Sequence, residues 1–187
     1  GFDHNSSVEG IGIHFQAGII NSSKCAFYSS SDNIVFHYSN STTAVTWNNS
    51  PLRASLTDSS TDSTGYKSFI SCLPNDLRSV IKPVKKYYNS SGYTQDAIFI
   101  LSPKELELTT PVSEPYSAVY SYYQGASADY TKRILNATTG NNVGNSCPYW
   151  TRVTMNASQQ YIITASGALN SSAVNINGGI TPCFVVG

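Results

Sequence analysis

The clearest hydrophobic pattern lies near the N-terminus, in residues 10–20. Ile11, Ile13 and Phe15 fall on one face of an extended chain, and His14 falls on the other. This two-residue period is typical of a strand with one buried face. We therefore expect a half-buried β-strand here.

Short runs of β-branched and aromatic residues recur along the rest of the chain, separated by stretches rich in Asn, Ser, Gly and Pro. They cover residues 33–38, 43–47, 67–72, 97–101, 106–110, 118–123, 150–155, 160–165, 173–176 and 183–186. Many short strands joined by polar turns predict a mainly β domain, an antiparallel β-sandwich or a barrel-like fold with long loops.

Helical patterns are scarce. Residues 75–81 can form a short capped helix that ends before Pro83, and residues 126–135 are a second candidate. Residues 52–64 are polar enough to form a mobile loop. We expect at most one or two short helices.

The composition describes an uncharged polar chain. Of its 187 residues 12% are charged, and 11 Lys and Arg balance 11 Asp and Glu. A typical soluble domain carries about 25% charged residues. The length predicts one domain over residues 1–187. The balanced charge argues against nucleic-acid binding, and no apolar run is long enough for direct membrane insertion.

Eight Asn-x-Ser/Thr sequons are spread over the chain. They begin at Asn5, Asn21, Asn40, Asn48, Asn89, Asn136, Asn156 and Asn170. Sequons of this kind accept N-linked glycans in the secretory pathway, and glycans would supply the solubility that few charges provide. The set predicts a secreted glycoprotein, located outside the cell or on a virion surface. Since no signal peptide is recognisable, we expect the chain to be part of a larger precursor.

The cysteines predict disulfides rather than a metal site. The chain has Cys25, Cys72, Cys147 and Cys183, widely spaced and without a Cys-x-x-Cys pair. In an oxidising compartment four cysteines give two disulfides in one of three pairings, and shorter loops favour Cys25–Cys72 and Cys147–Cys183. Neither a metal nor a cofactor is predicted. Trp47 and Trp150 are expected in the core rather than on a binding surface.

Catalytic motifs are absent from the sequence. The segment Gly125–Asp129 lacks the second glycine of a nucleophile elbow around Ser127. Glycoside hydrolysis needs two facing carboxylates, for which Glu105, Glu107 and Glu114 are candidates together with Asp129. Alternation with Leu106 and Leu108 places Glu105 and Glu107 on the wet face of a strand instead. We therefore expect no enzyme, and keep a secreted carbohydrate-active enzyme or esterase as an alternative.

Tyrosine is the strongest binding signal, since it occurs 13 times. A tyrosine ring combines a large apolar surface and a polar tip with a low entropy cost, so recognition surfaces use it together with Ser, Gly and Asn. Two clusters supply the expected binding residues, which are Lys85, Lys86, Tyr87, Tyr88 and Tyr93 in the first and Tyr120, Tyr122 and Tyr123 in the second.

Dense sequons, low charge, abundant Ser, Asn and Tyr, an even number of cysteines and short strands together resemble the receptor-binding domains of enveloped-virus surface glycoproteins, such as coronavirus spikes. The resemblance is one of composition and covers the chain diffusely. It implies attachment to a host cell-surface protein or glycan, beside other domains of the parent glycoprotein. A third alternative is a structural module of a larger ectodomain.

Overall fold

A computed structural model describes residues 42–57, 68–136, 145–175 and 178–187, together with the backbone of three two-residue strands nearer the N-terminus. These are β1 (Ile11–Gly12), β2 (Ile19–Ile20) and β3 (Ser23–Lys24). The remainder of the strand expected at residues 10–20, and all of that expected at residues 33–38, lie outside the described residues.

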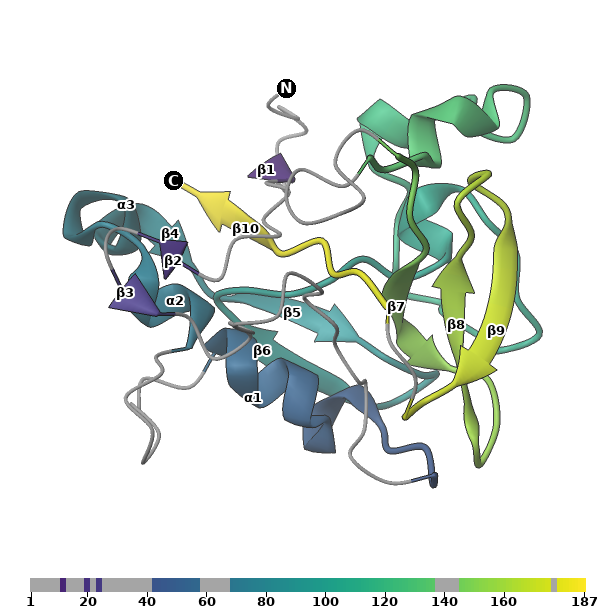
Figure 1. Cartoon of the computed structure of the whole chain (residues 1–187), viewed down its shortest axis with the longest axis horizontal. Coiled ribbons are helices and arrows are strands. Elements are labelled where there is room, and N and C mark those ends of the chain that lie inside the picture. The colour runs from purple at the N-terminus through teal and green to yellow at the C-terminus, as the bar shows by residue number, and fades with distance from the viewer. Residues whose placement is uncertain are drawn as a thin grey trace.

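Small antiparallel sheets form the described part of the fold. Strands β7 (Tyr149–Thr154), β8 (Gln159–Ile163) and β9 (Leu169–Ala173) make a three-stranded sheet at one end of the molecule (Figure 1). The helices gather at the other end, and the hairpin of β5 (Val84–Tyr87) and β6 (Tyr93–Asp96) lies between them. The expected mainly β, antiparallel fold is confirmed.

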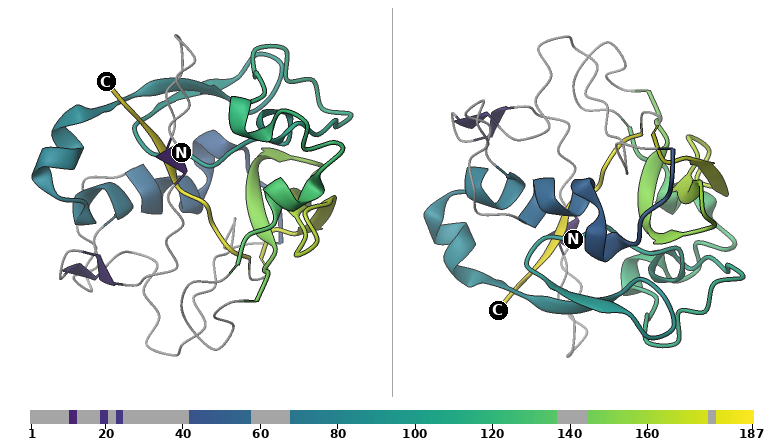
Figure 2. Two further views of the ribbon diagram at one scale, coloured as in Figure 1. Left: turned by 90° about the horizontal axis from the view of Figure 1, so that it is seen from above. Right: turned by 90° about the horizontal axis from the view of Figure 1, so that it is seen from below.

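The C-terminal strand links the two ends. Strand β10 (Cys183–Val186) pairs with β1 on one edge and with β4 (Ile81–Lys82) on the other. It runs from the side of the β7–β9 sheet toward the helices, as all three views show (Figures 1 and 2). The predicted strand at residues 183–186 is therefore confirmed.

The described helices are short. They are α1 (Pro51–Thr57), α2 (Phe69–Cys72) and α3 (Asn75–Val80), with the 3-10 turns η1 (Trp47–Asn49), η2 (Lys104–Leu106), η3 (Ser121–Tyr123) and η4 (Tyr130–Arg133). Helix α3 confirms the short helix predicted for residues 75–81, although no side chain caps its start and Ile81 already belongs to β4. Helix α1 replaces the first half of the loop expected at residues 52–64, because Leu52 and Leu56, one turn apart, both bury their side chains.

Several predicted strands are wrong. Residues 67–72 contain α2, where Phe69 and Cys72 share the buried face at a helical spacing. Residues 118–123 contain η3, and residues 106–110 form no strand. Residues 97–101 are joined to β10 by one bridge only, between Phe99 and Cys183. Apolar composition predicted the burial of Phe69, Phe99 and Leu106 correctly, but not the backbone conformation around them.

One hydrophobic core runs through the molecule between the helices and the sheets. Both tryptophans lie in it as predicted, since Trp47 and Trp150 are almost fully buried. Its other large members include Phe69, Phe99, Tyr149 and Phe184. Core side chains pack against one face of the hairpin, so that only its other face reaches solvent.

The register of the hairpin separates its side chains onto two faces. Lys85 pairs with Gln95 and Tyr87 pairs with Tyr93, so these four side chains share the outer face. Lys86 pairs with Thr94, and both are buried on the inner face. We refer to these as the outer and inner faces of the hairpin.

The turn of the hairpin is held by a side chain. The Asn89 carboxamide oxygen accepts hydrogen bonds from the backbone N–H groups of Ser91 and Gly92. A side chain at Gly92 would collide with the ring of Tyr88, whose atoms lie 2.6 Å from the position of a Cβ. The turn therefore fixes the register that places Tyr87 opposite Tyr93.

Candidate functional site

Three tyrosines form a continuous row on the outer face of the hairpin. The ring centroids of Tyr87 and Tyr93 lie 5.5 Å apart, and those of Tyr87 and Tyr116 lie 4.6 Å apart. Tyr116 comes from the loop after η2 and joins the two strand residues from outside the sheet. We call Tyr93, Tyr87 and Tyr116 the tyrosine row.

The row is exposed at both ends. Tyr93 keeps 48% of its surface accessible and Tyr116 keeps 66%, while the central Tyr87 is half-buried. The Lys85 ammonium lies 4.4 Å from the centroid of the Tyr93 ring, a cation–π contact. The outer face thus offers an aromatic surface at one end and a positive charge at the other.

The inner face of the same hairpin carries a buried ion cluster of Lys86, Glu105 and Arg152. Lys86 Nζ lies 2.8 Å from Glu105 Oε1, and Arg152 Nη2 lies 2.9 Å from Glu105 Oε2. All three side chains are almost fully buried. The cluster connects β5, η2 and β7, and the Arg152 Nε also donates to the backbone oxygen of Tyr87.

Glu105 is ionised inside this cluster. Burial alone would raise its pKa, but the charges of Arg152 and Lys86, with hydrogen bonds from Lys86 and Ser102, lower the pKa to about 2. Burial lowers the pKa of Lys86, against the opposing influence of Glu105. The expectation that Glu105 lies on the wet face of a strand is wrong, because two buried cations neutralise it in the interior.

The carboxylates considered for catalysis have other partners. Both oxygens of Glu105 are occupied by the cluster and by the Ser102 N–H. Glu107 is exposed and adopts a left-handed backbone with φ 59°, and its carboxylate accepts the backbone N–H groups of Gly125 and Ser127. This contact closes the loop around Ser127. The arrangement is structural in character.

Glu114 is the exception among the buried carboxylates. Its side chain is buried, and no hydrogen bond reaches its Oε2. Burial raises its pKa, and this outweighs the lowering effects of Ser102 and Arg152. A carboxylate in this environment opposes folding at neutral pH.

The structure places the predicted binding residues of the first cluster on different faces of the hairpin. Lys85, Tyr87 and Tyr93 meet on the outer face as expected, and Tyr116 completes the row. Lys86 is not a surface residue, because its ammonium lies in the ion cluster and 4.0 Å from the Phe99 ring centroid. The sequence does not single out Tyr116 as a binding residue, since only its packing against Tyr87 distinguishes it from the other tyrosines.

The second tyrosine cluster does not form one surface. The Tyr120 hydroxyl accepts a hydrogen bond from Lys86, and Tyr120 is half-buried. Tyr123 is also half-buried, its pKa is raised by burial, and its ring meets that of Tyr122 edge-on at 5.0 Å. Only Tyr122 is well exposed. Tyr88 of the first cluster covers Gly92 in the hairpin turn.

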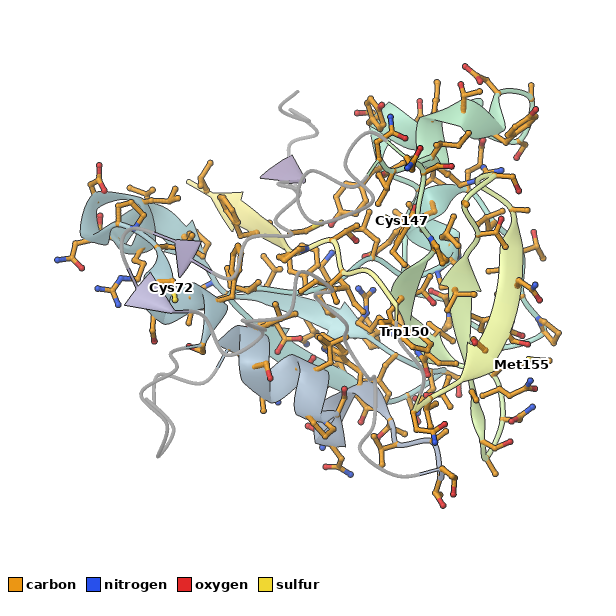
Figure 3. The ribbon with its side chains drawn as sticks, in the orientation of Figure 1. Cys72, Cys147, Trp150 and Met155 are labelled. Atoms are coloured by element: carbon orange, nitrogen blue, oxygen red, sulfur yellow. The ribbon has the colours of Figure 1, made fainter. Side chains whose placement is uncertain are left out.

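The predicted Cys147–Cys183 disulfide is absent, because both residues carry free thiols. The Cys183 thiol is buried and donates to the Thr181 carbonyl oxygen, and burial raises its pKa to about 12. Cys72 on α2 and Cys147 lie on well-separated sides of the molecule (Figure 3). Cys25, the other half of the predicted Cys25–Cys72 bridge, lies outside the described residues.

Four sequon asparagines, Asn48, Asn136, Asn156 and Asn170, are exposed, and Asn89 is half-buried in the hairpin turn. Asn5, Asn21 and Asn40 lie outside the described residues.

Within the described ranges no group of three His, Cys, Asp or Glu side chains could hold a metal ion. The helices of that same part of the chain are too short to cross a membrane.

These features define a small, mainly β domain with one exposed aromatic and cationic face above a buried ion cluster. The chain belongs to the family described as Domain of unknown function (DUF6273), whose model matches residues 29–187. No curated protein and no solved structure matches the chain significantly. The match spans both the hairpin and the strand that supplies Arg152.

Proposed function

We propose that this domain is a non-catalytic carbohydrate-binding module on the outside of a cell or virion, and that the outer face of the hairpin is its binding surface. The tyrosine row is the observation that carries the proposal. Tyr116 leaves two thirds of its surface in water although it packs on Tyr87. Adjoining exposed rings of this kind are typical of interaction sites.

The size of the face favours a saccharide over a protein as the ligand. The row with Lys85 and Gln95 amounts to five side chains. A stable protein–protein interface uses roughly 20–30 residues on each side. A sugar ring needs only an aromatic surface for its C–H groups and a few polar groups for its hydroxyls, and this face provides both.

Two further observations support a binding role outside the cell. Glu105 is a candidate for glycoside cleavage, but both of its carboxylate oxygens form ion pairs within the ion cluster. Four exposed sequon asparagines are accessible to glycosylation. The family match names neither a receptor nor a virus, so the resemblance to viral attachment domains stays a prediction.

A glycan array tests the proposal directly. The wild-type protein should bind a subset of glycans, and Tyr116→Ala should reduce that binding by up to about ten-fold, since a contact with an aromatic ring contributes about 0.5–1.5 kcal/mol. Tyr130→Ala is the matched control, because Tyr130 is similarly exposed but lies on η4, outside the row. Wild-type protein that binds no glycan, or equal losses in both variants, would refute the proposal.

A further inference from the structure

The charges around the hairpin indicate which saccharides this face accepts. We infer that the ligand is an acidic saccharide whose carboxylate binds the Lys85 ammonium while its sugar ring stacks on Tyr116. This inference rests on the proposed function and adds the charge of the ligand to it. It follows from the position of Lys85, the burial of the nearby carboxylates and the order of the groups along the face.

Lys85 presents an exposed ammonium group on the outer face. It is exposed on β5, and its Nζ is held over the ring of Tyr93 rather than beside a carboxylate. Among the residues that the structure describes, no carboxylate forms an ion pair with it. A cation–π contact orients the ammonium but does not neutralise it, so its positive charge stays available to a ligand.

The carboxylates of the surrounding elements point away from the outer face. Asp96 of β6 is buried on the inner face, where it pairs with Arg53. Glu105 is enclosed in the ion cluster, and Glu114 is buried beside η2. An anionic ligand that reaches Lys85 therefore meets no exposed acidic side chain on the hairpin itself.

The order of groups along the face sets the orientation of the ligand. Lys85 covers Tyr93 at one end, whereas Tyr116 is the most exposed ring at the other end, with Tyr87 between them. A sugar ring therefore stacks at the Tyr116 end. The carboxylate of the same or the next sugar unit then reaches the ammonium at the Lys85 end.

Titration with paired saccharides tests the inference. The probes are oligosaccharides of uronic or sialic acid, each paired with its methyl ester, which has the same size and no charge. Wild-type protein should bind the acid at least ten-fold more tightly than the ester, because a hydrogen bond to a charged group contributes about 1.5–3 kcal/mol. Lys85→Gln should abolish the preference, and Lys82→Gln, at an exposed lysine on β4 outside the row, should retain it.

The outcomes separate this inference from the proposed function. Equal affinity for acid and ester would overturn the acidic ligand, and a preference that survives Lys85→Gln would overturn the role of Lys85 in binding it. Both results would leave carbohydrate binding intact. Absence of binding to every glycan of the array and to both members of every pair would overturn both. The inference and the proposed function are both supported if Tyr116→Ala no longer binds the ester and Lys82→Gln keeps the wild-type preference for the acid.

Discussion

Two consecutive lysines show how differently the two faces of one hairpin are built. Lys85 stands in solvent over an exposed ring, whereas Lys86 is buried between Glu105, Tyr120 and the Phe99 ring. The two-residue period of a strand is the only cause of this difference, because it turns successive side chains to opposite faces. The inner lysine stabilises the fold, and the outer lysine is free to act on a ligand.

The difference is also one of rigidity. The inner face is fixed by hydrogen bonds from three elements, including the bond of Arg152 to the Tyr87 carbonyl. The outer face is fixed by ring packing alone, but its backbone is the same strand. Under the proposed function, the hydrogen-bonded inner face would preorganise the tyrosine row and lower the entropy cost of binding a ligand.

The largest effect is expected when the ion cluster loses its only carboxylate. Glu105→Gln removes the carboxylate that pairs with both Lys86 and Arg152, and should lower the free energy of unfolding by about 3–5 kcal/mol in urea titrations. Because the pKa of Glu105 falls from 4.5 to about 2 on folding, its contribution is present above pH 4.5 and is lost as the pH falls toward 2.

Glu107→Gln is the control for this substitution. In the wild type the two Glu107 oxygens accept the N–H groups of Gly125 and Ser127 near the surface; a glutamine keeps one of these acceptors, and water can satisfy the other N–H. Its unfolding midpoint should stay close to that of the wild type. Equal losses at the two positions would contradict a special role for the buried cluster.

The paired lysines give the next largest effect. Lys86→Met should cost about 3 kcal/mol, the lower end for a broken buried pair, because Arg152 still neutralises Glu105 and methionine packs well beside Phe99. Lys85→Met should change stability by no more than about 0.5 kcal/mol. Chemical unfolding of both variants measures the contrast, and similar losses would show that the two faces are not distinct.

Asp96 tests the other polar group of the inner face, with a smaller expected effect. Its carboxylate accepts the Trp47 indole N–H at 2.7 Å, the Arg53 Nε at 2.8 Å and the Thr94 hydroxyl. Asp96→Ala leaves the buried indole N–H without its acceptor and should cost about 2 kcal/mol. Gln95→Ala, on the outer face of the same strand, should leave the unfolding curve unchanged. A loss as large as that of Asp96→Ala would contradict this division.

The sequence predicts the outer half of the site better than the inner half. Lys85, Tyr87 and Tyr93 are identifiable from local composition, since exposed recognition residues need no distant partner. The ion cluster is not, because Lys86, Glu105 and Arg152 are separated by 19 and 47 positions and meet only through the fold. A lysine and a glutamate in a polar chain give no local sign that they are buried together.

The same distinction explains the errors in secondary structure. Strands β7 and β10 carry strong β-branched and aromatic patterns and are predicted within one residue. Residues 67–72 and 118–123 have similar composition, but their burial follows a helical spacing over a single turn, which is too short for a period to be read. The free thiols of Cys147 and Cys183 could not be foreseen, because loop length says nothing about how the two side chains are oriented.

The smallest expected effect concerns Glu114, and its sign is opposite to that of Glu105. Burial raises its pKa, so the folded protein holds this proton more tightly than the unfolded chain does. Glu114 therefore stabilises the fold below the pKa of the unfolded state, and that contribution is lost as the pH rises through the raised pKa.

Replacing Glu114 should accordingly stabilise the protein at neutral pH. Glu114→Gln removes a buried charge whose Oε2 has no hydrogen bond, and should raise the thermal midpoint by a few degrees at pH 7 with no gain at pH 4.

Glu107→Gln should behave in the opposite way, because hydrogen bonds from Ser127 and Gly125 lower the pKa of Glu107. Its small loss of stability should therefore appear at pH 7 and disappear at low pH. A loss of stability in Glu114→Gln at pH 7 would contradict this expectation. It would mean that the folded protein stabilises the ionised carboxylate, and that Glu114 contributes to the inner-face network instead of destabilising the fold.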